Sequence, residues 1–264
     1  MEFYLSSPGL LAPGLPGWRD SQAVLTGQAP YQNSPINRPN PKLLNRNSLR
    51  RATFTVRLAL HVTQDAFIGM ESLSSQLASV FACSGGDTDA LDQVFTALIQ
   101  PERPVSPNQF NNSVHNAPAG YWSIATGSQA PSISLSAYDA SFTAGLLEAG
   151  GLVYSTNQAV LLVTYDVPPP PPLTPFRPIL GPFAVAWVLT PERVSTSCSH
   201  LTQVSIVDGC PEDQLIDKDL EALRVGNPAA RSLPLLQCMA RRVTKTVLLP
   251  YLPDTQVSVQ HHPC

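Results

Sequence analysis

Apolar residues along the chain recur with two different spacings, which predict alternating helices and strands. A spacing of three to four residues predicts helices at Leu49–Phe67, Asp87–Ile99 and Ala140–Ala149. Polar and apolar residues alternate from Ser132 to Ser136, which predicts a short strand. The uninterrupted apolar run Ala159–Tyr165 is typical of a central strand that is buried on both faces.

Weaker patterns extend this reading to the rest of the chain. Further strands are expected at 2–5, 79–83, 183–189, 246–252 and 255–260, and a further helix at 213–224. Residues 13–47 are rich in Pro, Asn and Gly and are expected to be irregular. In the helix from Asp87, which Asp87 or Thr88 would cap, four apolar residues are expected to point inward: Leu91, Val94, Phe95 and Leu98.

One turn stands out because it joins a strand directly to a helix. Asp139 lies between the strand at Ser132–Ser136 and the helix from Ala140, where backbone N–H groups and the positive end of the helix dipole converge. The favoured interpretation is that Asp139 caps the helix. The alternative is a carboxylate that performs acid–base chemistry. A polar loop bounded by proline, Ser106–Asn116, precedes this region.

Five consecutive prolines, Pro168–Pro172, interrupt the strand pattern. Proline fixes its own backbone and cannot continue a sheet, so an extended polyproline segment is expected. The favoured interpretation is a stiff connector between two strands, and the alternative is a docking site for a proline-recognition domain.

Composition limits the possible partners. Apolar residues make up 43% of the 264 positions, which indicates a globular chain, and charged residues only 13%, which favours a surface partly covered by a partner. The net charge of −3 and the lack of a recognised basic patch argue against nucleic acid. Without an apolar run of 18 residues or a signal-peptide pattern, we expect a cytoplasmic protein with no membrane span.

The five cysteines suggest neither a disulfide framework nor a metal site. Their number is odd and no CxxC occurs, so reduced thiols are expected, with a Cys198–Cys210 pair as the less favoured alternative. Cys83 lies in an apolar strand, where a cysteine is usually an inert core residue. No nucleophile-elbow, phosphate-binding, dinucleotide-binding or metal-ligand spacing is present, so no cofactor and no metal are expected.

Several residues before the elbow follow one another in a familiar order. They are Ser106-Pro107, Asn116, Ala119-Gly120, Ser123-Ile124, Gly127, Ala130-Pro131, the strand 133–136 and Asp139. This order resembles the nucleophile region of the β-ketoacyl synthases, condensing enzymes of the thiolase superfamily. Upstream, Arg50-Arg51 with Thr53–Phe67 and the segment Ser79–Gly86 resemble the family's first long helix and its next strand and glycine turn. The segment from Ser113 to Ala125 is most similar to a short ketosynthase-like family from polyene biosynthesis.

The resemblance implies an α/β, thiolase-like, layered α-β-α fold in which the N-terminal half is present and the C-terminal half is reduced. A single domain of residues 1–264 is expected, in which 1–190 resemble the ketosynthase N-terminal half and 191–264 form a short, divergent part. The family's catalytic Cys position falls on Asp139. Its two catalytic histidines have no match, because His200, His261 and His262 lack the family's surroundings, and the last two are expected in solvent.

The implied function is that of a non-catalytic subunit, a chain-length factor. It would pair with a full-length ketosynthase and help to elongate a polyene or fatty acyl chain on a transiently bound acyl carrier protein. The resemblance places the dimer interface and the end of the acyl tunnel at Phe110, Asn112, Ser113, His115, Asn116 and Ala117. It places Ile133 and Leu135 on the strand that pairs across the dimer.

Two other functions stay open from the residues alone. One is a free-standing decarboxylase or hydrolase that uses Asp139 or His115. The other is a homodimeric acyl-binding protein without chemistry.

Overall fold

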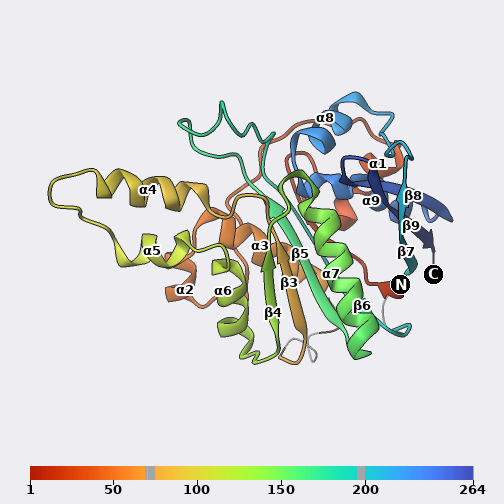
Figure 1. Cartoon of the computed structure of the whole chain (residues 1–264), viewed down its shortest axis with the longest axis horizontal. Coiled ribbons are helices and arrows are strands. Elements are labelled where there is room, and N and C mark those ends of the chain that lie inside the picture. Colours follow the sequence, from red (N-terminus) through yellow and green to blue (C-terminus); the bar gives the residue numbers. More distant parts are fainter. Residues whose placement is uncertain (69, 71–74, 195–199, 264) are drawn as a thin grey trace.

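A computed structural model describes residues 1–68, 70, 75–194 and 200–263. Within these residues nine strands form one mixed sheet in the order β4-β3-β5-β6-β1-β7-β9-β8, with β2 paired to β6 (Figure 1). The strands are β1 (Glu2–Leu5), β2 (Gly9–Leu11), β3 (Ala78–Ala82), β4 (Ser132–Leu135), β5 (Val160–Asp166), β6 (Phe183–Thr190), β7 (His200–Asp208), β8 (Lys245–Leu252) and β9 (Thr255–His262). Strands β4, β3 and β5 are parallel, and the other pairings are antiparallel.

Helices cover both faces of the sheet. They are α1 (Trp18–Thr26), α2 (Arg46–Arg51), α3 (Phe54–Ala66), α4 (Thr88–Leu98), α5 (Pro107–Ser113), α6 (Ala117–Thr126), α7 (Ser141–Thr156), α8 (Lys218–Gly226) and α9 (Leu233–Arg241), with short 3-10 turns η2 (Tyr138–Ala140) and η3 (Ala229–Ser232). Alternate residues of β5 enter two separate cores, because side chains of a strand point to opposite faces. Leu161 and Val163 pack with α3 and α6, whereas Val160 and Leu162 pack with α1, α7 and α9. The layered α-β-α fold is therefore confirmed.

The long apolar runs were read correctly, but the first predicted helix is two helices. Helix α2 ends at Arg51, the backbone of Ala52 is extended, and α3 begins at Phe54. The side chain of Thr53 accepts a hydrogen bond from the backbone N–H of Val56 at 3.3 Å, which makes it the cap of α3. Apolar spacing continued across this break because both helices cover the same core.

The predicted polar loop at 106–116 is wrong, since most of it is helix α5. Pro107 stands at the first turn, where a missing N–H costs nothing. Asn112 is buried, and its side-chain amide donates to the carbonyl oxygens of Asn108 at 2.8 Å and Arg51 at 3.2 Å. Helix α6, which follows at once, was not predicted either. Helix α5 has no apolar periodicity and is held by contacts with other segments.

Helix α4 buries a different face from the predicted one. Val94 and Ala97 are buried and Leu91 is half-buried, but Phe95 is 60% and Leu98 45% exposed. The reason is the position of α4, which packs against α5 in an arm that extends from the sheet (Figure 1). One narrow face of the helix is enough for that contact.

The proline run does not form one extended exposed segment. Pro169 is buried, and the chain turns from Pro170 onward, where the backbone N–H groups of Leu173 and Thr174 donate to the Pro170 carbonyl. The expected polyproline conformation is therefore wrong for Pro171 and Pro172, because they lie inside a turn that these local hydrogen bonds close.

The C-terminal part contains more structure than expected. The helix predicted from Asp213 begins at Lys218, because the Asp217 side chain caps it and Asp213 instead pairs with Lys245 at 2.6 Å. Strand β7 and helices α1 and α9 were missed. Strand β7 pairs with β1, so both ends of the chain share one sheet. The boundary near residue 190 stays a prediction.

His261 is buried rather than solvated. Its Nε2 atom lies 2.8 Å from Nδ1 of the buried His200, and its Nδ1 atom donates to the Val243 carbonyl at 2.9 Å. The expectation that the terminal histidines hang in solvent is therefore wrong for His261. Strand β9 continues through these residues and pairs with β7, so alternate side chains must enter the core.

Two further predictions concern the cysteines and the membrane. Among the cysteines that the structure describes, Cys83, Cys210 and Cys238 are free thiols, and Cys198 lies outside the described residues. In the described part of the chain, none of the helices combines the length and apolarity needed to cross a bilayer.

Candidate functional site

The elbow between β4 and α7 is a 3-10 turn held by Ser141. The Ser141 hydroxyl accepts from the backbone N–H of Ala137 at 3.1 Å and donates to the Tyr138 carbonyl at 2.7 Å. Tyr138 has φ of 53°, in the left-handed region that few residues other than glycine adopt. Local hydrogen bonds thus fix a sharp turn that presents Tyr138 and Asp139 at the carboxyl end of β4.

Asp139 does not cap α7. The cap residue is Ala140, without a side-chain bond, and Asp139 Oδ1 instead accepts from Arg177 Nη1 at 2.6 Å. The Arg177 guanidinium also lies 3.8 Å from the centre of the Tyr138 ring, which adds a cation–π contact. The favoured capping interpretation is therefore wrong. The Asp139 carboxylate is 53% exposed and is paired with the Arg177 guanidinium.

A second polar cluster is buried at the carboxyl ends of β3 and β5. Asp166 Oδ1 accepts from the Ser84 backbone N–H at 2.9 Å and from the Ser84 hydroxyl at 2.5 Å. Burial raises the pKa of Asp166 to about 6, although the Ser84 hydrogen bonds oppose the rise. The Ser136 hydroxyl donates to the Ser84 carbonyl at 2.9 Å, which connects this cluster to the end of β4.

Cys83 belongs to the same cluster and is inert as a nucleophile. It is buried, its sulfur accepts from the Gly86 backbone N–H at 3.2 Å and lies 3.5 Å from Asp166 Oδ1. Burial, followed by the Asp166 charge, raises the pKa of the Cys83 thiol well above its ordinary value. The thiol therefore stays protonated, as the sequence interpretation required.

His115 reaches this cluster from the segment between α5 and α6. Its Nε2 atom donates to the Cys83 carbonyl at 3.0 Å, because a carbonyl oxygen only accepts. Within the described ranges, no hydrogen bond or ion pair joins His115 to Asp139. The two candidate acid–base residues are thus not arranged as a catalytic pair.

The other predicted interface residues lie on three neighbouring elements. Phe110 is 59% exposed on α5, and Ser113 donates from its hydroxyl to the Phe110 carbonyl at 2.8 Å. Asn116 is exposed and Ala117 is nearly buried at the start of α6. Both line a groove of 630 Å³ between α2, α5 and α6, with Leu43, Leu44, Asn45, Ser48, Arg51, Asn108, Asn111, Val114, Gly120, Tyr121, Ile124 and Ala125.

Ile133 and Leu135 lie on β4, the outermost strand at one edge of the sheet. Both are half-buried and pack against the core on the α7 side. Strand β4 pairs with β3 on one side, and among the described residues no strand pairs with its other side. The backbone on that side is available for pairing with another chain.

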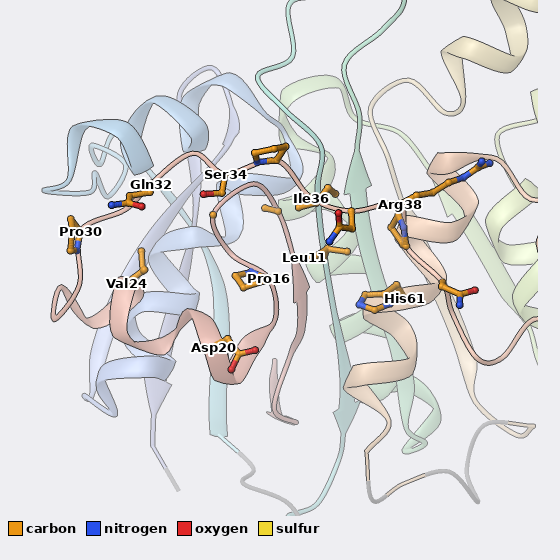
Figure 2. Close-up of a pocket in the computed structure, with 16 residues that line it drawn as sticks. Leu11, Pro16, Asp20, Val24, Pro30, Gln32, Ser34, Ile36, Arg38 and His61 are labelled. Carbon is orange, nitrogen blue, oxygen red and sulfur yellow. The ribbon is translucent and has the colours of Figure 1, made fainter.

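A further cavity lies away from all predicted site residues. It measures 540 Å³, and Figure 2 shows it between the segment that carries Gln32, Ser34 and Ile36 and the helix that carries His61. The cavity is lined in part by residues 13–47, which were expected to be irregular. An irregular segment has no periodic pattern from which a cavity lining could be predicted. Its mixed polar and apolar lining does not select a ligand.

Together, a layered α-β-α fold and a strand–turn–helix elbow at the sheet's carboxyl edge define a condensing-enzyme type of architecture. The sequence family described as beta-ketoacyl synthase, N-terminal domain, matches residues 18–245, and the chain belongs to this family. The match extends on both sides beyond the resembling motifs, which run from Arg50 to Asp139. No curated protein matches the chain.

Solved structures show the same fold at low sequence identity. One is described as the ketosynthase ApeO in complex with its chain length factor ApeC from Xenorhabdus doucetiae, with TM-score 0.74, 20% identity, and coverage of 98% of this chain and 99% of that chain. The ishigamide ketosynthase/chain length factor has TM-score 0.75, 10% identity and coverage of 100% and 99%. The type II polyketide synthase complex AntDE:AntF, a carrier protein with its ketosynthase, has TM-score 0.75, 11% identity and full coverage of both chains.

Proposed function

We propose that the chain is a non-catalytic ketosynthase-like subunit that pairs with an active β-ketoacyl-carrier-protein synthase and shapes its acyl tunnel. The unpaired edge of β4 is the observation that supports this most directly. The Ser79 N–H donates to the Pro131 carbonyl and the Cys83 N–H to the Leu135 carbonyl. Because N–H and C=O of one strand residue point the same way, Ser132 and Ser134 direct theirs outward.

Exposed apolar side chains on the arm and on α6 support the same interface. Phe95 and Leu98 on α4, Ile99 directly after it, Phe110 on α5 and Ile124 on α6 are all exposed. Large exposed apolar patches on a protein surface commonly mark sites of protein–protein interaction. A partner strand added to β4 would extend the sheet, and the neighbouring arm would contact the partner.

The absence of chemistry is proposed from the elbow. The position that matches the family's cysteine is Asp139, whose carboxylate is held by Arg177. A carboxylate is a poor acyl carrier, because the mixed anhydride it forms hydrolyses readily. The buried Cys83 thiol and the engaged His115 do not replace a nucleophile and a base.

A carrier protein is proposed as a transient partner because of a charge concentration that the sequence analysis missed. Six of the 16 Lys and Arg residues lie between Arg38 and Arg57, and no acidic residue occurs from 38 to 64. Arg38, Arg50 and Arg51 line a groove at the start of α3, opposite Asp87 and Asp89, so basic residues are in excess there. Such a surface favours an acidic protein partner and would speed its association.

The pairing is tested by the mass in solution of the chain expressed with and without a full-length β-ketoacyl synthase from the same genome. We expect a stable one-to-one complex that forms on co-expression. A homodimer that ignores the ketosynthase would overturn the proposal. In that case bound acyl chains in the purified homodimer would support the acyl-binding alternative.

Product length is expected to change with the bulk at the groove between α2, α5 and α6. Ala117→Leu should shorten the acyl product, because Ala117 lines this groove. Phe110→Ala should lengthen it, because Phe110 is exposed on α5, whose Asn108 and Asn111 border the groove, and the tunnel end is proposed there. The distribution of chain lengths from the reconstituted pair, measured by mass spectrometry, checks this. Tyr154→Ala, on the exposed face of α7, is the matched control. Altered yield with constant length would leave only a scaffold role.

Asp139→Asn separates the proposed function from the enzyme alternative. The Asp139–Arg177 pair is half-exposed, so its loss should cost less than about 1 kcal/mol of stability and leave elongation by the pair unchanged. An acid–base catalyst would instead lose roughly 100-fold or more in rate. Acyl-thioester hydrolysis and malonyl decarboxylation are measured for the chain alone, with the exposed Asp254→Asn as control. An activity that Asp139→Asn abolishes would favour the enzyme.

A further inference from the structure

The loop between β5 and β6 is attached to the rest of the molecule at a few defined points. We call residues 168–182 the strap; it lies at the top of the view in Figure 1. At its C-terminal end the Leu180 N–H donates to the Gly226 carbonyl at 2.7 Å, and Asn227 Nδ2 donates to the Gly181 carbonyl at 2.8 Å. In its outer part Phe176 is 82% exposed.

Arg177 is the strap side chain that connects this outer part to the elbow. Its Nη1 atom pairs with Asp139 and its guanidinium stacks on Tyr138. The Nη2 atom of the same group is buried and, among the described residues, has no hydrogen-bond partner. A buried guanidinium N–H without an acceptor is costly, so a second acceptor is expected close by.

Asp166 supplies the complementary group. The carboxyl is almost fully buried, its Oδ1 atom is occupied by Ser84, and within the described residues its Oδ2 atom has no partner. The charge of Arg177 acts on this carboxyl and lowers its pKa, against the larger effect of burial. The guanidinium therefore pairs directly with Asp139, while its charge also acts on Asp166.

We propose that Arg177 alternates between Asp139 and Asp166, and that the strap shifts with it. When Asp166 is ionised, its charge draws Arg177 inward, since the attraction is stronger in the buried site than at half-exposed Asp139. When Asp166 is protonated, Arg177 stays on Asp139. This two-position contact is independent of the proposed pairing with a ketosynthase.

The groups around Asp166 allow its carboxyl to change between protonated and ionised near neutral pH. They are the Cys83 thiol and the Ser84 hydroxyl after β3, the neighbouring Tyr165 on β5, Arg177 on the strap, and Asn227, whose amide donates to the Asp166 main-chain carbonyl at 3.4 Å. Burial raises the pKa values of the Cys83 thiol and the Tyr165 hydroxyl well above their ordinary values, so both stay neutral at pH 5–8. A pKa of about 6 places the change of Asp166 inside this range.

Hydrogen exchange of the strap amides, corrected for intrinsic rates, tests the proposal on the full chain. Protection of residues 171–180 is expected to rise at least threefold from pH 5 to pH 7.5, because Arg177 then holds the strap inward. Asp166→Asn should remove this step, whereas Asp139→Asn, on the surface, should keep it and raise protection at pH 7.5. Asp213→Asn, which loses the separate pair with Lys245, is the control that keeps the step.

Two results would overturn the inference. One is a step of the same size in Asp166→Asn, which would assign it to another group. The other is that protection of the strap does not change between pH 5 and pH 7.5, either in the parent chain or in Asp139→Asn. This result would mean that Arg177 has one position. Because Asp139→Asn changes only a half-exposed side chain, the second comparison holds even where Asp166→Asn fails to fold.

Discussion

Replacing Ser134 by proline is expected to weaken pairing with a ketosynthase strongly while the chain itself stays folded. Ser134 lies on β4, and its N–H and C=O point away from β3. Proline removes that N–H, and its ring occupies the space in which a partner strand would lie. The β3–β4 ladder keeps its bonds, because these involve Pro131, Ile133 and Leu135. Edge strands tolerate proline for this reason.

The expected effect on the complex is large. A lost ladder bond that leaves the partner's carbonyl buried without a donor costs about 1–3 kcal/mol, which raises Kd roughly 5- to 150-fold. Titration of the purified ketosynthase with the variant measures this, and circular dichroism with thermal melting checks the fold.

Ser134→Val is the matched control, because valine keeps the N–H and favours a strand. It should bind like the parent chain. Equal affinity of Ser134→Pro and Ser134→Val for the ketosynthase would show that β4 is not the pairing edge. The interface would then have to be sought elsewhere, with the exposed arm of α4 and α5 as the next candidate.

The fold could be predicted where burial on both faces produced long apolar runs. Strands β5 and β6 were located within a residue or two because almost every position in them is apolar. Helix α5 could not be found in this way, since its large apolar residue Phe110 faces solvent and gives no apolar periodicity. The helix is held by the Asn112 side chain and by packing on α4. The periodicity of apolar residues indicates which side chains are buried. It gives no indication of a helix that is stabilised by tertiary hydrogen bonds.

The same reasoning explains what was missed at the elbow. The sequence identified the turn and Asp139, because a strand pattern changes to a helix pattern there. It did not identify Arg177, which is 38 positions away in sequence and follows a proline run that suggested a connector. An N-cap and a long-range ion pair are both ordinary uses of an aspartate. The ion pair forms here because the strap brings Arg177 next to Asp139, which the local sequence around Asp139 does not indicate.

His200 and His261 are a second long-range pair, and they are expected to make the protein sensitive to acid. The pKa of His200 is lowered to about 4, first by burial and then by the neighbouring His261 and Arg242. Burial also lowers the pKa of His261. Because the Nδ1–H of His261 donates to Val243, its Nε2 can accept from His200 only while His261 is neutral.

The sign follows from the lowered pKa. The unfolded chain binds a proton at His200 below about pH 6.5, whereas the folded chain resists it until about pH 4, so stability falls as pH decreases through this window. This one site accounts for about 2 kcal/mol of the free energy of unfolding lost between pH 7 and pH 5. Urea unfolding at the two pH values measures the loss.

A variant at the same position shows whether the loss belongs to this histidine. His200→Gln keeps an N–H that can donate to His261 and removes the titration. Between pH 7 and pH 5, its free energy of unfolding should therefore decrease by about 2 kcal/mol less than that of the parent chain. His262→Gln, the half-buried neighbour on β9, should behave like the parent chain. If His200→Gln and the parent lose equal stability, His200 is protonated in the folded state as easily as in the unfolded chain. The sheet around β7 and β9 would then admit enough water to solvate the charge, and acid would destabilise the protein through carboxylates elsewhere.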